Sequence, residues 1–275
     1  MSRLDGRVAL VAGASRGMGQ GCAIELGAAG AFVYLLGRTA GSAGDGRTDT
    51  LAHTLEIIQA SGGAGKAIAC DCADPQQLAA AIAGIERDRG RLDVVVNSVF
   101  STPTFPGMIG KRIWEVPDDL WHSVVQVPGR AAYFTTAHAA RLMMRSASAA
   151  VPGLIVNISG RGALRYRYNT AYGIGKAAIA RLTHDTALEL KPHHVAVIAV
   201  WPNGYAADPS KPETPRYTGR AVAALAADPH VMARSGTHMW SAEAGAEYGF
   251  TDEFGHSHEV STLTDQYSLE HEAEA

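Results

Sequence analysis

The sequence has few cysteines, no long hydrophobic run and no marked excess of charge of either sign. Its three cysteines, Cys22, Cys70 and Cys72, cannot form a disulfide framework, and no cluster of histidines completes a zinc site around them. The apolar runs have the length of strands and fall far short of the roughly 20 residues that a membrane helix needs. A formal net charge of −3 gives no electrostatic case for binding nucleic acid or an anionic membrane. We therefore expect a cytoplasmic globular protein that binds no metal, membrane or nucleic acid.

The chain does contain a regular alternation of short apolar blocks and longer amphipathic segments. The blocks predict strands at Arg7–Ala12, Ala31–Leu36, Lys66–Cys70, Asp93–Asn97, Leu154–Ile158 and Val195–Trp201. Helical periodicity predicts helices at Gly17–Ala29, Leu51–Ala60, Pro75–Arg89, Asp118–Met144 and Ala171–Leu190. Strands that are apolar on both faces and alternate with helices indicate a parallel sheet covered on both sides. We expect one α/β domain over residues 1–275, a doubly wound Rossmann-type sheet of about seven strands.

Three segments are expected to lie outside this framework. Thr39–Thr50 is rich in Gly, Ser, Thr and Asp and is predicted to be a surface loop. Pro202–Pro215 has a similar composition, and residues 202–235 are expected to form a lid or substrate loop at the carboxyl ends of the strands. The acidic tail Glu270–Ala275 is expected to fray.

A glycine-rich turn follows the first predicted strand and opens the first predicted helix. Its glycines are spaced G-x-x-x-G-x-G rather than G-x-G-x-x-G. Glycine there permits a tight turn and lets backbone N–H groups approach a pyrophosphate at the helix N-terminus. Any strand-to-helix turn favours glycine, but this one lies at the first junction of a βαβ unit. The residues expected to bind a dinucleotide are Gly13, Ser15, Arg16, Gly17, Met18 and Gly19.

The end of the second predicted strand favours NADP over NAD. NAD sites commonly have an acidic residue there to bind the ribose 2′-hydroxyl, whereas this chain has Arg38 and Thr39. A guanidinium suits a 2′-phosphate, and Arg16 is placed to reach the same group from the glycine turn. The alternative is that both arginines are solvated loop residues.

Tyr172 and Lys176 are the candidates for chemistry. They lie four residues apart near the start of a predicted helix, so their side chains share one face. A nearby cation lowers the pKa of a phenol from about 10, which makes Tyr172 a candidate general acid/base for interconversion of a carbonyl and an alcohol. A Y-x-x-x-K pair is common by chance, but this one follows a predicted strand that ends at Ser159.

Together these motifs resemble the short-chain dehydrogenase/reductase family, in a bacterial branch similar to the dehydrogenase/reductase member 1 group. The resemblance implies that Tyr172 donates or accepts the proton and that Lys176 lowers its pKa and binds the nicotinamide ribose. It implies that Ser159 holds the substrate oxygen. For the cofactor it implies that Asp71 and Cys72 contact the adenine. It also implies that Asn97 lies beside the adenosine ribose and that Pro202 lies against the nicotinamide.

The chain departs from the family pattern at four places. Val99 and Phe100 follow Asn97-Ser98 where the family has small residues, and Gly160 occupies the second position of a serine doublet, so that Ser159 is offset by one. Pro128 aligns with a helix asparagine that holds a relay water, and a proline there preserves a kink and leaves a carbonyl free. A threonine that clasps the nicotinamide has no counterpart after Pro202.

Three arginines, Arg161, Arg165 and Arg167, precede Tyr172 in a loop that borders the substrate cleft in this family. They are candidates to bind a carboxylate or phosphate of the substrate, with solvated arginines or a subunit contact as the alternative. The last two predicted helices, Asp118–Met144 and Ala171–Leu190, resemble the pair that forms subunit interfaces in this family, and their alanines allow close helix approach. The resemblance therefore implies a homodimer or homotetramer.

Three functions stay open on sequence grounds. The first is an NADP-dependent oxidoreductase for a ketone or aldehyde and the corresponding alcohol. The second uses Tyr172 and Lys176 for non-redox proton transfer, as in an isomerase, dehydratase or cyclase. The third, a nucleotide-responsive binding protein, would leave the Tyr–Lys pair unexplained.

Overall fold

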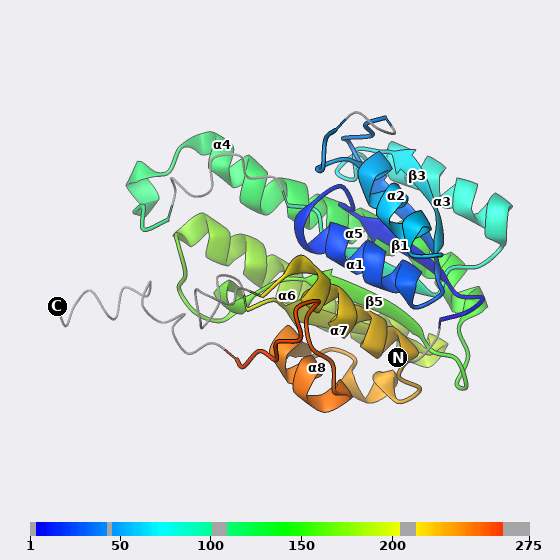
Figure 1. Ribbon diagram of the computed structural model, residues 1–275. Helices are drawn as coiled ribbons and strands as arrows, with labels where there is room; N and C mark the ends of the chain where they lie inside the picture. Colours follow the sequence, from blue (N-terminus) through cyan, green and yellow to red (C-terminus); the bar gives the residue numbers. More distant parts are fainter. Residues whose placement is uncertain (1–3, 43–45, 101–108, 204–212, 261–275) are drawn as a thin grey trace.

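Seven parallel strands form one sheet in the computed structural model, which describes residues 4–42, 46–100, 109–203 and 213–260. Their order across the sheet is β3-β2-β1-β4-β5-β6-β7 (Figure 1). The strands are β1 (Val8–Ala12), β2 (Phe32–Gly37), β3 (Ala64–Ala69), β4 (Val94–Asn97), β5 (Gly153–Ile158), β6 (Val195–Trp201) and β7 (His238–Trp240). The helices are α1 (Gly17–Ala28), α2 (Leu51–Ala60), α3 (Pro75–Arg89), α4 (Asp118–Trp121), α5 (Val127–Ser146), α6 (Thr170–Leu190), α7 (Pro215–Ala227) and α8 (Ser241–Tyr248). The predicted doubly wound α/β fold is confirmed.

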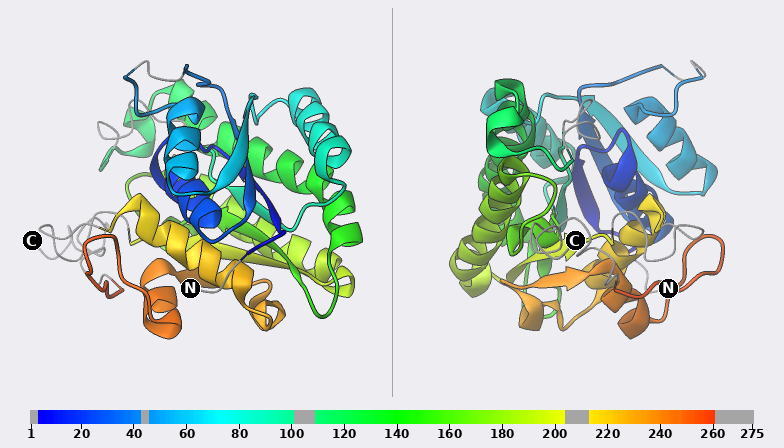
Figure 2. Two further views of the ribbon diagram at one scale, coloured as in Figure 1. Left: turned by 45° about the vertical axis from the view of Figure 1, so that its right-hand side comes forward. Right: turned by 90° about the vertical axis from the view of Figure 1, so that its left-hand side faces the viewer.

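Helices cover both faces of the sheet, as Figure 2 shows. Ala9 and Val11 of β1 belong to a core that includes residues of α1, α2 and α7. Val8 and Leu10 of the same strand belong to a second core with α3, α5 and α6. Alternate residues of a strand point to opposite faces, so an entirely apolar strand supplies both cores. This is why the central strands appear in the sequence as unbroken apolar blocks.

The strand order reverses direction beside β1. From β1 the chain builds outward through β2 to β3, then returns to place β4 on the other side of β1. In open parallel sheets, ligands bind outside the carboxyl ends of the strands at such a reversal. The sheet therefore places a binding crevice after β1 and β4.

Most predicted bounds agree with the structure to within two residues, but one predicted helix is interrupted. The segment Asp118–Met144 forms α4, a π-helical turn over His122–Gln126, and then α5. Pro128 has no N–H to donate to the carbonyl four residues earlier, and the chain adopts the wider turn just before it. The kink expected from this proline is thus a π-helical turn. The sequence predicts no range for the short strand β7, because three residues are too few to show a hydrophobic period.

The segment over residues 202–235 is only partly a loop. Pro215–Ala227 forms α7, whose apolar face lies in the core with Ala221, Val222 and Leu225. A role for this segment as a lid stays a prediction. The tail Glu270–Ala275 lies outside the described residues.

Helices α1 and α7 meet at glycines with almost no side chain between them. A Cβ atom on Gly21 would lie 2.0 Å from the carbonyl oxygen of Pro215, and one on Gly219 would lie 2.3 Å from the carbonyl oxygen of Gly21. Neither distance is possible for a real side chain, so both positions require glycine. The two backbones consequently pack in direct contact.

Candidate active site

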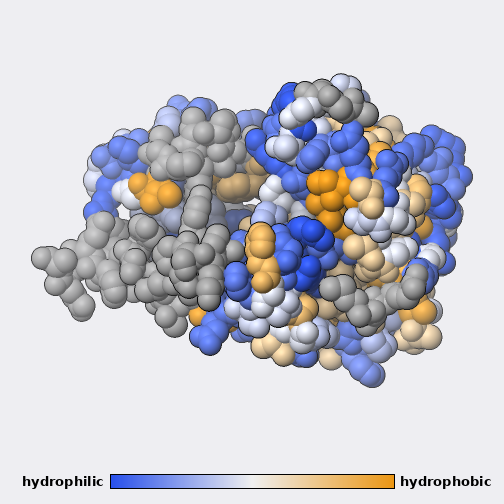
Figure 3. Space-filling model, in the orientation of Figure 1, coloured by the Kyte–Doolittle hydropathy of each residue, from blue (hydrophilic) through white to orange (hydrophobic). Residues whose placement is uncertain are grey.

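A cavity of about 560 Å³ lies at the reversal of the strand order. In Figure 3 the molecule is hollowed between α4 and the layer that carries α1 and α2. The structure brings nearly all predicted site residues to its wall. These are Gly13, Ser15, Arg16, Gly17, Met18, Arg38, Thr39, Asp71, Cys72, Asn97, Ser159, Tyr172, Lys176 and Pro202. The remaining one, Gly19, lies behind the wall in α1.

The glycine turn has the geometry of a phosphate cradle. Gly13 has a φ of +87°, and a Cβ atom there would lie 2.7 Å from the carbonyl oxygen of Ser98. A Cβ atom on Gly19 would lie 2.0 Å from the carbonyl oxygen of Gly13. Position 19 therefore requires glycine for packing against the turn, although it does not line the cavity. Arg16, the N-cap residue of α1, makes no capping hydrogen bond with its side chain. The first N–H groups of α1 are therefore available to an anion.

The nucleotide end of the cavity carries two exposed arginines. Arg16 and Arg38 both line it, from the glycine turn and from the end of β2. Asp71 and the buried Cys72 line it after β3, and the carboxylate of Asp71 accepts a hydrogen bond from the N–H of Ala73 at 3.0 Å. This part of the cavity wall is placed to hold the adenosine end of a dinucleotide.

Asn97 is anchored in a buried polar network between strands and helices. Its Nδ2 donates to Oδ1 of Asn157 at 2.8 Å and to Oγ1 of Thr136 at 3.1 Å. Asn157 in turn donates to Oγ1 of Thr183 at 2.9 Å. Within the described part of the chain, Oδ1 of Asn97 is buried without a hydrogen-bond partner. A buried acceptor of this kind at the cavity wall suits a hydroxyl of the cofactor.

The N-terminal turn of α6 fixes the position of Tyr172. The side chain of Asn169 caps the helix, because its Oδ1 accepts the N–H of Tyr172 at 2.9 Å. Lys176 follows one turn later, with Nζ 5.6 Å from the centre of the Tyr172 ring and 5.0 Å from that of Phe100. The Phe100 ring meets the Tyr172 ring edge-on, with centres 6.3 Å apart. The bulky residue that departs from the family pattern thus packs on both members of the pair.

Burial changes the proton affinity of both side chains. It raises the pKa of Tyr172 above its ordinary value, against the smaller lowering effect of the Arg167 guanidinium. It lowers the pKa of Lys176 to about 8. Desolvation opposes the charged forms of both groups, so it raises the pKa of the phenol and lowers that of the amine. A lowering of the Tyr172 pKa by the Lys176 charge stays a prediction.

Ser159 and Gly160 line the same cavity as Tyr172. Ser159 is 5% exposed, and its Oγ has no hydrogen-bond partner within the described residues. A Cβ atom on Gly160 would lie 3.5 Å from the hydroxyl of Tyr172, an ordinary contact. A Cβ atom on Gly162 would lie 2.5 Å from Cε1 of the Tyr172 ring, so that position must be glycine. The glycine at position 160 therefore leaves space beside the hydroxyl of Tyr172.

Pro128 and Val124 of the π-helical turn line the cavity next to α6. A Cβ atom on Gly175 would lie 2.1 Å from the carbonyl oxygen of Val124. The N–H that would bond this carbonyl in an α-helix belongs to position 128, where proline has none. The carbonyl of Val124 consequently faces the backbone next to Lys176.

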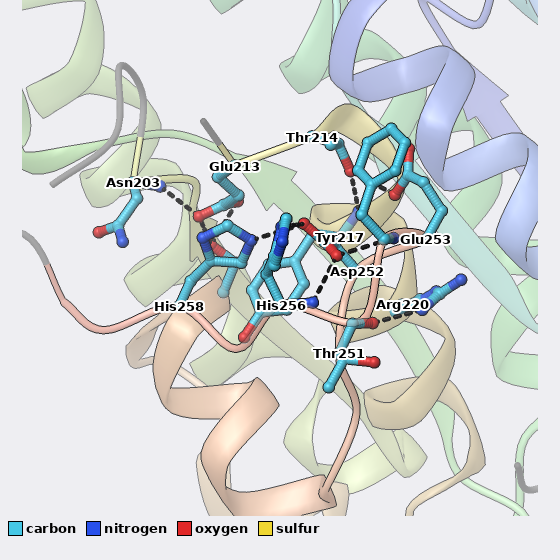
Figure 4. Close-up of polar contacts among 12 residues, drawn as sticks. Asn203, Glu213, Thr214, Tyr217, Arg220, Thr251, Asp252, Glu253, His256 and His258 are labelled. Carbon is cyan, nitrogen blue, oxygen red and sulfur yellow. Dashed lines mark hydrogen bonds and ion pairs between the residues drawn. The ribbon is translucent and has the colours of Figure 1, made fainter. Parts of the chain in front are cut away.

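A buried carboxylate that the sequence does not predict supports the cavity wall at Asn203. Glu213 is 5% exposed, and it accepts the N–H of Asn203 at 3.0 Å and hydroxyl hydrogen bonds from Thr218 and Ser241. Burial raises its pKa. Figure 4 shows Glu213 between Asn203 and His258. An isolated glutamate in a polar segment gives no sequence signal of such a network.

Within the part of the chain that the structure describes, none of the helices has the length and apolar character required to span a bilayer. The same residues contain no group of three or more His, Cys, Asp or Glu side chains placed to hold a metal ion.

Comparison with known proteins places this geometry in context. The family model for short chain dehydrogenases matches residues 7–217. Dehydrogenase/reductase SDR family member 1 of Homo sapiens is 34% identical over 274 residues, covering 90% of this chain and 84% of the human protein. A metagenomic short-chain oxidoreductase solved in complex with NADP is 31% identical, with a TM-score of 0.67 over 82% of this chain and 92% of its own. Carveol dehydrogenase of Mycobacterium avium, solved in complex with NAD, shares the fold at 21% identity, with a TM-score of 0.71 over 87% and 97% of the two chains.

Proposed function

The chain belongs to the short-chain dehydrogenase family, and we propose that it is an NADP-dependent oxidoreductase that interconverts a ketone or aldehyde with an alcohol. The observation that carries the proposal is that Tyr172 and Lys176 line the same cavity as the glycine cradle. A proton-transfer group and a dinucleotide site on one wall are what hydride transfer to a carbonyl requires.

Each residue of the site has a defined task in this proposal. When bound, the cofactor supplies or accepts the hydride. Tyr172 Oη gives the substrate oxygen its proton in reduction and takes it back in oxidation. Lys176 binds ribose hydroxyls, and its charge favours the phenolate when it is protonated. Ser159 Oγ donates to the substrate oxygen, where negative charge develops in the transition state.

Turnover of the cofactor tests the proposal. We expect the wild-type protein to change the absorbance of NADPH when supplied with ketones or aldehydes. Non-redox proton transfer is the second candidate, because Gly160 lies where a second serine would stand beside Tyr172. That candidate predicts conversion of substrate with no net change in NADPH. A panel of carbonyl compounds that leaves NADPH unchanged would contradict the redox proposal.

The preference for NADP rests on Arg16 and Arg38. The two ligand-bound relatives above contain NADP and NAD, so they do not choose between the cofactors. We expect NADPH to bind more tightly than NADH, and Arg38→Ala to weaken NADPH binding roughly 10- to 150-fold, since a charge-assisted hydrogen bond contributes about 1.5–3 kcal/mol. Titration of both cofactors measures this, with Arg47→Ala, an exposed arginine away from the cavity, as the control. Equal affinities in the wild type, or no loss in Arg38→Ala, would contradict the assignment.

We also propose a cytoplasmic homodimer or homotetramer that uses α5 and α6. Tyr133 on α5 is 56% exposed, and Ile174 and Leu188 on α6 are 43% and 63% exposed. Exposed apolar side chains on two neighbouring helices suit a subunit contact. Light scattering should give a mass above one chain, and a monomer at micromolar concentration would contradict this.

A further inference from the structure

The cavity carries cationic side chains at both ends. Arg16 and Arg38 line the nucleotide end, whereas Arg161 and Arg167 line the end that contains Tyr172. Asp71, at the nucleotide end, is the one acidic residue among the described residues of the wall. The 2′-phosphate of the cofactor accounts for the first pair. Proton and hydride transfer to a neutral ketone gives no reason for the second.

Arg167 is built into the catalytic end rather than solvated. It is 8% exposed, and its Nη2 donates to the hydroxyl of Tyr168 at 2.8 Å. Its guanidinium carbon lies 4.6 Å from the centre of the Tyr168 ring. That ring meets the Tyr172 ring edge-on, with centres 5.0 Å apart. The Tyr168 ring therefore contacts both the guanidinium and the ring of Tyr172, and the Arg167 charge acts to lower the Tyr172 pKa.

The backbone at this point is held in an unusual conformation. Tyr168 has a φ of +66°, which is rare for a bulky side chain. Its carbonyl accepts the N–H of Gly110 at 2.9 Å, and the carbonyl of Arg167 accepts the N–H of Asn169 at 2.8 Å. These bonds fix the turn that places Arg167 and Tyr168 at the cavity wall immediately before the cap of α6. Backbone strain of this kind concentrates at functional sites.

From this geometry we infer that the substrate is a carbonyl compound, or its alcohol, that carries a carboxylate bound by Arg167. A planar guanidinium matches a carboxylate in a bidentate pair, and the attraction is stronger in an enclosed site than in water. One deeply buried arginine suits the single charge of a carboxylate better than a phosphate dianion. Arg161, on the same wall, adds to the positive potential. The inference rests on the proposed oxidoreductase function and specifies its substrate class.

The test compares acids with their esters. A series of linear and aryl keto acids with increasing distance between ketone and carboxylate is assayed with NADPH beside the matching methyl esters. For the spacing that fits best, we expect the wild type to favour the acid at least tenfold in kcat/KM, mainly through KM. Arg167→Met should bring the acid-to-ester ratio close to one, and Arg167→Lys, which keeps the charge without the planar fork, should restore part of it. Arg165→Met, in the same loop but exposed and away from the cavity, should keep the wild-type ratio.

A second measurement separates the substrate class from the reaction. Calorimetry measures binding of the keto acids to the enzyme saturated with NADP, with thermal melting to show that each variant is folded. Turnover of acids and esters at equal efficiency in the wild type would overturn the carboxylate inference and leave the oxidoreductase proposal standing. Acids that bind to the wild type but not to Arg167→Met, without any turnover, would support the carboxylate site and contradict the redox proposal. Turnover of esters with no binding or turnover of any acid would overturn the carboxylate inference alone, whereas absence of turnover for acids and esters, with no acid bound, would overturn both.

Discussion

Replacement of Tyr172 by phenylalanine is expected to lower kcat/KM by a factor of roughly 10²–10⁴, since this is the usual contribution of a positioned general acid or base. The change removes only the hydroxyl, and the ring keeps its edge contacts with Phe100 and Tyr168. The loss should appear in redox and non-redox chemistry alike, because both need the proton of Tyr172. NADPH affinity, measured by titration, should change no more than a few-fold.

Tyr166→Phe is the matched control for this variant. Tyr166 lies in the same loop, is partly exposed and does not line the cavity, so its variant should keep wild-type activity. A Tyr172→Phe enzyme that retains more than a tenth of wild-type kcat/KM would remove Tyr172 from the catalytic role.

Ser159→Ala is expected to lower the rate by roughly 10²–10³, or about 2.7–4 kcal/mol, if its hydroxyl donates to the substrate oxygen as charge develops there. The expectation rests on a buried Oγ at the cavity wall that lacks a hydrogen-bond partner in the described part of the structure. Steady-state kinetics of the folded variant measure the effect. Since Ser159 has no described partner to lose, its replacement should leave thermal stability almost unchanged.

Gly160 makes this test sharper. A Cβ atom there would lie 3.5 Å from the hydroxyl of Tyr172, an ordinary contact, so Gly160→Ser is expected to place a hydroxyl near that of Tyr172. If a serine is needed at this wall, the double variant Ser159→Ala/Gly160→Ser should recover part of the lost rate. A Ser159→Ala enzyme within about threefold of wild type, with Tyr172→Phe inactive, would reject the role of Ser159 and favour the non-redox alternative.

The parts of the site that the sequence predicts are those determined by short-range geometry. The glycine turn, the four-residue spacing of Tyr172 and Lys176, and the strand ends at Asn97 and Ser159 follow from periodicities of two and of 3.6 residues. Once the sheet is parallel, its topology brings those strand ends to one edge. These local patterns are therefore enough to predict that Asn97, Ser159 and the glycine turn lie together at the cavity.

What the sequence could not show depends on contacts between distant segments. The sequence marks Arg161, Arg165 and Arg167 alike as candidates, and only the folded loop shows that Arg167 is buried at the cavity wall while Arg165 is exposed away from it. Glu213 joins Asn203, α7 and α8 through hydrogen bonds that no local pattern reports. Burial raises the pKa of Tyr172, and the extent of this burial depends on the whole fold rather than on the four-residue spacing to Lys176.

The glycine contact between α1 and α7 gives the two ends of the cavity a mechanical connection. A backbone-to-backbone contact has no side-chain rotamers that can adjust, so a displacement of one helix is passed to the other. In the proposed function the N-terminus of α1 receives the cofactor phosphates, and α7 begins just after Glu213, which accepts the N–H of Asn203 at the cavity wall. We therefore expect a cofactor bound at α1 to restrict the motion of α7 and of the wall that Glu213 holds. An ordered sequence in which the cofactor enters before the substrate is the kinetic consequence that we expect from this packing.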